Sequence, residues 1–358
     1  MIEKRILLIS SRPLEHSGMT KIEMDIIDYN YQAIKFDLAC GFDLDDEYAQ
    51  VLKMKSVKYV HLISKRKVLK YMKDIFNTVK NGDYEKVYIH GNSSLMILEA
   101  LPAKLAGAKV VTHCHNTKPK RFSAHYYLIK PFFNCLVDYK IGCSKKASEW
   151  AYCGKRIITI RNGVDVQRFA YKPTVRLKMR DELGIDNSFV VGHIGTFNAQ
   201  KNHKRLVDIF EVINRKNPNS KLLLVGDGEL YDEIMAYIKI KHLQENVISV
   251  RNVDNPEDYY QVMDVLIMPS LFEGLCLVGL EAQASGLPVL LSDTITDEAV
   301  VTKKCVMCKL SDDDNDWAEM ALTIGKQKRE NMSSLMQLKG YSYDEMMSSI
   351  RTVLLYEK

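Results

Sequence analysis

The chain has 358 residues, of which 46% are hydrophobic and 27% charged, as in ordinary globular proteins. This length favours two domains, and no apolar run approaches the ~20 residues needed to cross a bilayer. Residues 1–165 hold 27 Lys and Arg against 17 Asp and Glu, whereas residues 166–358 hold 23 against 28. Because no nucleic-acid motif accompanies the basic half, it favours an anionic membrane surface or a phosphorylated substrate over nucleic acid.

The apolar run at the N-terminus, Ile6–Ile9, is too short for a signal peptide and predicts a first strand. We therefore expect a cytoplasmic protein, whose basic half would allow peripheral binding to the inner face of a membrane. Most of the eight cysteines lie in apolar runs, which indicates reduced, buried thiols. Cys305 and Cys308 form a lone C-x-x-C, expected to be two thiols of a strand.

Metal binding is not predicted. His113-Cys114-His115 has suitable ligand types, but a strand turns successive side chains to alternate faces. No cofactor is predicted either, because no G-x-G-x-x-G follows a strand, which argues against NAD or FAD.

Short β-rich runs alternate with helical patterns through the first half of the chain. Expected strands cover residues 5–10, 36–39, 57–62, 86–90, 109–113, 139–143 and 156–160. Expected helices cover residues 21–29, capped by Thr20, then 68–80, 93–105, 123–136 and a segment that begins at Ser144. This alternation predicts a parallel, doubly wound sheet.

Polar residues follow several of these strands, at the edge where parallel sheets bind ligands. Each has an ordinary structural explanation as well, such as the N-G turn and the helix cap at Ser144. Their recurrence at one edge nevertheless predicts a site. The residues are Ser17, Gly18, His90, Asn92, His115, Asn116, Ser144 and Asn162 to Asp165.

The periodicity breaks at residues 166–188, which we predict to be a linker with a short charged helix, 175–183. Beyond it, strands are expected at 189–194, 222–225, 247–250, 265–268 and 289–291, and helices at 204–214, 229–240, 312–326 and 341–355. These elements predict a second doubly wound domain. The predicted organisation is therefore a first domain of residues 1–165, a linker 166–188, a second domain 189–340 and a terminal helix within 341–358.

The stretch from Pro269 to Gly286 carries the strongest functional signal. It turns at Gly274 and begins a helix near Cys276, where backbone N–H groups would face an anion. Glu273 lies in the turn and Glu281 in the helix. The spacing of these two carboxylates, E-x7-E, resembles the signature of retaining GT-B glycosyltransferases of the large family four, which includes enzymes of bacterial capsule and exopolysaccharide synthesis.

Other segments carry the same resemblance. The loop Gly195–His203 is similar to the family's G-R-F-x-x-Q-K-N-H, and His113 to Asn116 match its H-x-H-N. Cys143-Ser144 and the N-G-V-D at Asn162 also match. The sequence departs from the family at two positions: Ser17 replaces the first of two glycines, and Thr196 stands where an arginine is usual.

The resemblance implies an α/β GT-B fold, in which two Rossmann-like domains face a central cleft and the last helix returns to the first domain. It implies a retaining, metal-independent hexosyltransferase that uses a nucleotide-diphosphate sugar, expected to be a UDP-sugar. The acceptor would be a glycan or lipid-linked glycan in surface polysaccharide synthesis.

The resemblance also implies roles for residues. Lys201 and the helix N-terminus would stabilise the leaving diphosphate, Glu273 would orient the sugar, and Glu281 would bind the ribose. His115 would contact the sugar or the acceptor. The expected donor-binding residues also include Gly274, Leu275, Cys276, Leu277, Thr196, Asn198, Arg205, Arg251, Asn252, Val253 and Gly18. The expected acceptor side consists of Ser17, His90, Asn92, Asn116 and Asn162.

Three alternatives stay open. Ser17 and Thr196 motivate a GT-B-like nucleotide-sugar-binding or partner protein with reduced catalysis, and a sugar-nucleotide epimerase would share the fold. A glycosidase-like use of Glu273 and Glu281 is weaker, because one residue lies in a turn and the other two helical turns further on. A phosphorylase is disfavoured, since no lysine cofactor motif is present.

Overall fold

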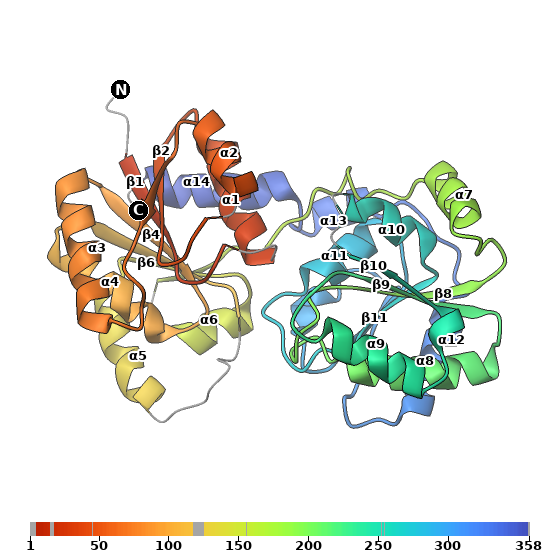
Figure 1. Ribbon diagram of the computed structural model, residues 1–358. Helices are drawn as coiled ribbons and strands as arrows, with labels where there is room; N and C mark the ends of the chain where they lie inside the picture. Colours follow the sequence, from red (N-terminus) through yellow and green to blue (C-terminus); the bar gives the residue numbers. More distant parts are fainter. Residues whose placement is uncertain are drawn as a thin grey trace. The chain divides into compact units, whose positions relative to one another are not determined.

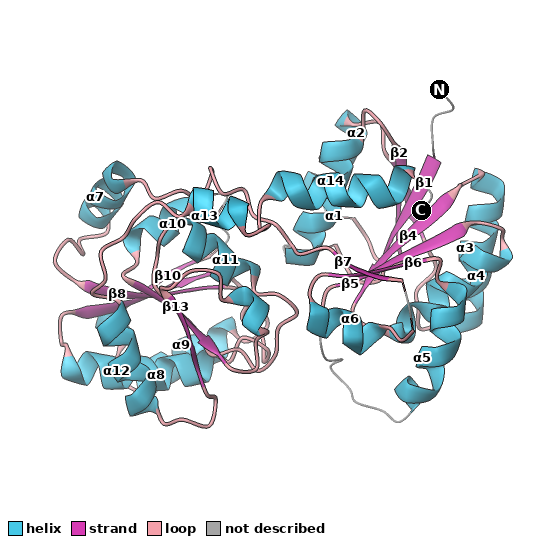
Figure 2. Cartoon of the chain, turned by 180° about the vertical axis from the view of Figure 1, so that it is seen from behind, coloured by secondary structure: helices cyan, strands magenta, loops and turns pink. Residues whose placement is uncertain are grey.

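The computed structural model describes residues 5–14, 18–44, 46–116, 125–154, 156–251, 253 and 255–356. Its contacts divide the chain into two compact units, Met1–Arg161 with Glu345–Lys358, and Asn162–Asp344. Each unit is a parallel sheet covered by helices (Figures 1 and 2). Two residues of the predicted site, Ser17 and Asn252, lie outside the described residues.

The first unit contains a seven-stranded parallel sheet in the order β3-β2-β1-β4-β5-β6-β7. Its strands are β1 Arg5–Ser10, β2 Lys35–Cys40, β3 Lys58–His61, β4 Lys86–Gly91, β5 Lys109–Cys114, β6 Tyr139–Gly142 and β7 Ile157–Thr159. The order reverses between β1 and β4, so this junction is the topological switch point at which doubly wound sheets bind ligands. The predicted doubly wound sheet is confirmed.

Helices cover both faces of this sheet. They are α1 Gly18–Asn30, α2 Asp46–Met54, α3 Val68–Gly82, α4 Ile97–Leu105 after the 3-10 turn η1 Ser94–Met96, α5 His125–Leu136, α6 Lys145–Ala151 and α14 Tyr343–Leu355. Leu7 and Ile9 of β1 point into a core with α3, α4 and α5. Because side chains alternate along a strand, the neighbouring residues of β1 serve the opposite face, which α1 and α14 cover (Figure 2).

The terminal helix α14 belongs to the first unit. Arg351 donates hydrogen bonds to Asn30 Oδ1 and to the carbonyl of Tyr29 at the end of α1, both at 2.8 Å. The fully buried Lys86 donates to the carbonyls of Val353 and Leu354 at 2.9 and 2.8 Å. A cation at the C-terminal end of a helix is favourable, because the last carbonyls lack partners within the helix.

The second unit contains a six-stranded parallel sheet in the order β10-β9-β8-β11-β12-β13. The strands are β8 Phe189–Ile194, β9 Ser220–Val225, β10 Val247–Val250, β11 Val265–Met268, β12 Val289–Ser292 and β13 Cys305–Cys308. The helices are α7 Pro173–Glu182, α8 His203–Lys216, α9 Tyr231–Ile240, α10 Pro256–Val262, α11 Leu277–Ala284, α12 Asp314–Ile324 and α13 Ser333–Leu338, and two 3-10 turns are η2 Gln244–Asn246 and η3 Asp297–Ala299. Helices α8, α9 and α12 share one core with this sheet.

Residues 166–188, predicted to be a linker, pack within the second unit. Arg176 and Arg180 of α7 bind Asp264, which follows α10, at 2.5 and 3.3 Å. Arg180 also donates to the carbonyl of Val262 at 2.8 Å. The segment is therefore fixed to the second sheet by buried, charge-assisted hydrogen bonds.

Some predicted elements differ from the structure. Helix α1 begins at Gly18, so Thr20 is an internal residue and not the predicted cap. The cap at Ser144 is confirmed, since its Oγ accepts from the Ala147 amide. Helices α2, α10 and α13 were not predicted; α10 and α13 span only 7 and 6 residues, too short for a clear 3.6-residue pattern. Cys305 and Cys308 lie in β13 as predicted, both as free thiols.

No helix among the described residues is both long and apolar enough to cross a membrane.

Candidate functional site

The turn before α11 holds a buried ion pair. Lys201 Nζ lies 2.6 Å from Glu273 Oε1, and the two side chains are only 15% and 10% exposed. Ser270 Oγ donates to the same carboxylate oxygen at 3.2 Å. Burial lowers the pKa of Lys201, but the charge and hydrogen bond of Glu273 outweigh it, so the pKa is raised overall. Lys201 is thus held as a cation beside the start of a helix.

Two hydrogen bonds join the Lys201 loop to this turn. The Leu271 amide donates to the carbonyl of Gln200 at 2.8 Å, and Asn202 Nδ2 donates to the carbonyl of Pro269 at 3.1 Å. Asn202 has a φ of 58°, a left-handed conformation that asparagine tolerates better than most residues. These bonds fix the position of Lys201 relative to α11, although the two segments are 72 residues apart.

Glycines let a third loop approach the Lys201 loop closely. A Cβ on Gly226, which has a φ of 136°, would lie 2.3 Å from the carbonyl oxygen of Gly195. A Cβ on Gly228 would lie 2.6 Å from the carbonyl oxygen of Phe197. The Phe197 amide donates to the carbonyl of Asp227 at 2.9 Å. The G-D-G sequence therefore serves loop packing at the carboxyl ends of β8 and β9.

Glu281 lies within α11, and its Oε2 accepts a hydrogen bond from the hydroxyl of Tyr260 at 2.6 Å. Tyr260 itself is fully buried on α10. The tyrosine therefore orients the carboxylate, a contact that the sequence did not predict.

Cys276, the cap position of α11, is buried. Burial, and next the charge of Glu273, raise the pKa of its thiol to about 12.

Two buried histidines support the same loop. His193 Nδ1 lies 2.9 Å from the carbonyl oxygen of Ile267, and the His203 ring stacks on Phe197 with centroids 4.0 Å apart. Burial lowers the pKa of His193 to about 4 and that of His203 to about 2, so both rings are neutral at pH 7. The sequence analysis did not assign them a role.

The remaining predicted donor residues have the following positions and contacts. Thr196 is exposed, and Asn198 Oδ1 accepts from the Lys201 amide at 3.2 Å. Arg205 pairs with Asp314 of α12 at 2.8 Å, so its charge is partly neutralised there. Arg251 binds Asp227 through both carboxylate oxygens at 2.8 Å. Val253 is half-buried, and the main chain of Gly18 begins α1.

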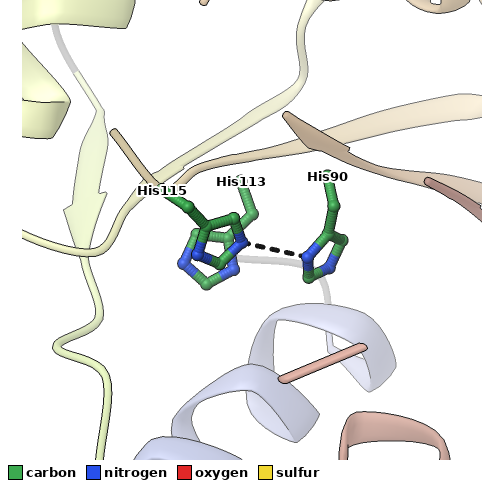
Figure 3. A group of neighbouring side chains, drawn as sticks. All are labelled: His90, His113 and His115. Carbon is green, nitrogen blue, oxygen red and sulfur yellow. Dashed lines mark hydrogen bonds between the residues drawn. The ribbon is translucent and has the colours of Figure 1, made fainter. Parts of the chain in front are cut away.

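A second cluster lies in the first unit, at the ends of β4 and β5. His90 pairs directly with His113 in the sheet, and the His115 amide donates to the carbonyl of Gly91 at 3.0 Å. The rings of His90 and His115 meet through Nδ1 and Nε2 at 3.0 Å (Figure 3). Burial lowers the pKa of all three imidazoles, and that of His115 falls to about 3.

The expectation that strand alternation would separate the H-C-H side chains is wrong for the two histidines. Residues two apart share a strand face, and the rings of His113 and His115 lie 4.0 Å apart. Only Cys114 points away, into the core formed with α3, α4 and α5. The period-2 pattern itself could have predicted the pairing.

The predicted acceptor residues take structural positions. The carbonyl of Asn92 accepts from Trp150 Nε1 at 3.2 Å, and the carbonyl of Asn116 accepts from the Cys114 thiol at 3.3 Å. Asn162 is buried, and its Oδ1 has no hydrogen-bond partner among the described residues. Among the predicted residues of the first unit that the structure describes, His90 and His115 make a side-chain contact with each other.

The chain is similar in sequence to proteins named as glycosyltransferases. Residues 175–337 match the family model described as glycosyl transferases group 1. EpsF of Bacillus subtilis, named as a glycosyltransferase, is 29% identical over 82% of this chain and 81% of its own. The UDP-Gal:alpha-D-GlcNAc-diphosphoundecaprenol alpha-1,3-galactosyltransferase of Escherichia coli is 30% identical over 64% of this chain and 63% of its own.

Solved structures show the same fold. HepE of Anabaena in complex with UDP-glucose has a TM-score of 0.81 and 18% identity, covering 98% of this chain and 99% of that chain. The chain therefore has the GT-B fold, and residues 175–337 of its second unit are similar to group 1 glycosyl transferases. Lys201, Glu273 and Glu281 all lie within the matched residues.

Proposed function

We propose that this protein transfers a hexosyl group from a UDP-sugar to a glycan or lipid-linked glycan acceptor, with retention of anomeric configuration and without a metal ion at the donor. The observation that carries the proposal is the buried Lys201–Glu273 pair at the start of α11. A cation beside the N-terminus of a helix suits an anionic leaving group. The match to group 1 glycosyl transferases over 175–337 supports the same chemistry.

In the proposed reaction, the acceptor hydroxyl oxygen forms a bond to the anomeric carbon while the bond from that carbon to the diphosphate oxygen breaks. The hydroxyl proton passes to the departing phosphate on the same face of the sugar. The diphosphate gains negative charge in this step, so groups that bind this charge lower the barrier. Lys201 supplies a fixed positive charge, and the first amides of α11 supply dipoles.

The two glutamates have separate roles in this proposal. Glu273 keeps Lys201 charged and placed before the donor arrives, and its second oxygen would orient the sugar hydroxyls. Glu281, held by Tyr260, would bind the ribose hydroxyls. We assign His115 no direct contact with the substrate in this proposal, because its Nε2 faces His90 and its Nδ1 is buried in the protein.

The names of the relatives support the donor and acceptor classes. The Escherichia coli relative is named for UDP-Gal and a diphosphoundecaprenol-linked acceptor, and HepE was solved with UDP and with UDP-glucose. A lipid-linked acceptor would explain the excess of basic residues in 1–165, since such acceptors lie in anionic membranes. We therefore propose a cytoplasmic protein that binds peripherally. Salt-sensitive binding to acidic-lipid vesicles would support this placement, and salt-insensitive binding would contradict it.

The test is a panel of nucleotide sugars, screened first by thermal stabilisation and then by transfer to glycan and lipid-linked acceptors. We expect one UDP-sugar to stabilise the protein and to be consumed only with an acceptor. Replacement of Glu273 or Glu281 by alanine should abolish transfer in folded variants. Unchanged transfer rates in either variant would refute the assigned roles.

Thr196 favours one competing function, a nucleotide-sugar-binding protein with reduced catalysis, because a donor-binding cation of the family is absent there. Arg205 is bound to α12 through Asp314 and does not obviously replace it. Binding of UDP without transfer to any acceptor would support this alternative. Conversion of the sugar without an acceptor would instead indicate an epimerase.

A further inference from the structure

The imidazole cluster of the first unit is arranged around a common point. His90 and His113 are register partners at the ends of β4 and β5, and His115 follows two residues later on the same face. One ligand atom from each of the three rings lies within 4.8 Å of the others. Figure 3 shows the rings side by side at the strand ends.

The distances suit a transition metal. Zinc binds histidine nitrogen at about 2.0–2.1 Å in tetrahedral geometry, which places neighbouring ligand atoms ~3.3 Å apart. His90 Nδ1 and His115 Nε2 are separated by 3.0 Å. An ion could bind both nitrogens after the proton of this hydrogen bond has left and their separation has grown by a few tenths of an ångström.

His113 completes the nitrogen set in the way that metal ligands usually do. Its Nδ1 lies 2.8 Å from the hydroxyl of Tyr88, which fixes the ring, while Nε2 has no partner among the described residues. Metal-bound histidines commonly hold their second nitrogen by such a hydrogen bond. The tyrosine therefore leaves Nε2 as the atom available to an ion.

A buried acidic side chain lies beside His90. Glu23 of α1 is 0% exposed, and neither of its oxygens has a hydrogen-bond partner of good geometry among the described residues. Its Oε1 lies 3.9 Å from His90 Nδ1. The charged form of such a buried group is costly, and a bound cation would offset that cost.

We propose that this cluster is a binding site for one divalent transition-metal ion, Zn²⁺ by its donor chemistry, held by His90, His113 and His115 and balanced by Glu23. Three imidazoles and one carboxylate are nitrogen and oxygen donors that zinc accepts readily, whereas magnesium and calcium prefer oxygen alone. The ion would join α1 to the ends of β4 and β5. It takes no part in the proposed donor chemistry, so zinc binding and sugar transfer can fail separately.

The experiment measures zinc binding to the full chain without nucleotide, after removal of metal by a chelator. Cys135 and Cys153 are exposed thiols and are changed to serine in every sample, so that they do not bind the ion. We expect one Zn²⁺ per chain by calorimetry and elemental analysis. Glu23→Gln and His115→Ala should each raise the dissociation constant for Zn²⁺ at least about tenfold. The matched control His61→Ala, an exposed histidine of β3, should leave it unchanged.

A second measurement is X-ray absorption at the zinc edge of the chain that carries only the Cys135 and Cys153 changes. It tests the proposal even if Glu23→Gln or His115→Ala does not fold. A first shell of nitrogen and oxygen with imidazole scattering at about 2.0 Å is expected. A shell that contains sulfur would overturn the proposal, as would binding below one ion per chain. Equal affinity in folded Glu23→Gln, His115→Ala and control proteins would also overturn it.

Discussion

Replacement of Glu273 by glutamine tests the energetics of the buried pair. Glutamine keeps the shape of the side chain and an oxygen for Ser270, but it removes the negative charge 2.6 Å from Lys201 Nζ. Removing one partner of a buried ion pair costs about 3–5 kcal/mol. Since the amide oxygen still accepts a hydrogen bond from Lys201, we expect a loss of roughly 2–4 kcal/mol in the free energy of unfolding.

The assay is urea or thermal unfolding of the second unit, followed by the fluorescence of Trp317. This tryptophan is fully buried in the second unit, and Trp150→Phe removes the signal of the first. For a unit of this size the midpoint should fall by roughly 5–15 °C, at about 2–4 °C per kcal/mol. Trp317 therefore reports the unfolding step in which the Lys201–Glu273 pair is lost.

A double-mutant cycle with Lys201→Met isolates the interaction. The double variant removes both charges and should be less destabilised than the sum of the two single variants, by about 2 kcal/mol or more. The exposed pair Lys216–Glu319 has a similar separation, 2.7 Å, but side chains 34% and 63% exposed. Its cycle should give less than about 1 kcal/mol. Additive effects within ~0.5 kcal/mol for the buried pair would refute the reasoning.

Three further changes probe the surroundings. Gly226→Ala would place a Cβ 2.3 Å from the Gly195 oxygen and should weaken UDP binding, measured by calorimetry, at least about tenfold. The control is Gly184→Ala, where φ is 65° and no atom lies within 4 Å of the new Cβ. This control should change the free energy of unfolding by only about 1 kcal/mol and leave UDP binding unaltered. Lys86→Met should cost about 2–3 kcal/mol in urea unfolding, because two carbonyls of α14 lose a charged donor; an unchanged midpoint would contradict this. His193 has a folded pKa of about 4 against 6.5, so its contribution to stability is present above pH 6.5 and is lost as pH falls towards 4, by up to about 3 kcal/mol. His193→Gln should flatten the stability curve in that window, and an equal slope would show that another group titrates.

Much of the fold could be predicted from local patterns. The bounds of β1 and β8 follow from apolar runs of strand length, and the cap at Ser144 from its side-chain chemistry. Polar helices of fewer than eight residues, such as α10, were missed because so short a segment shows little periodicity. Short helices of this kind form because neighbouring helices provide surfaces on which they pack, α7 for α10 and α11 for α13.

The site was predicted in part. The resemblance placed Lys201 and Glu273 at the donor, but their direct contact depends on two loops that meet only in the folded sheet. The His90–His113 pairing likewise requires the order of β4 and β5, which a single sequence does not specify. Glu23 gave no signal at all, because it is one acidic residue in an amphipathic helix. Long-range partners of this kind need the tertiary structure.

In the proposed reaction, Lys201 stabilises the charge of the leaving diphosphate. The most direct measurement compares kcat for sugar transfer in Lys201→Met and in Lys204→Met. Lys204 is an exposed lysine in the first turn of α8, three residues after Lys201. Both variants are measured at a temperature where Trp317 fluorescence shows them to be folded. We predict that kcat falls about 10²–10³-fold in Lys201→Met and stays within about twofold of the unmodified protein in Lys204→Met. A folded Lys201→Met protein with kcat within about fivefold of the unmodified protein would contradict the account.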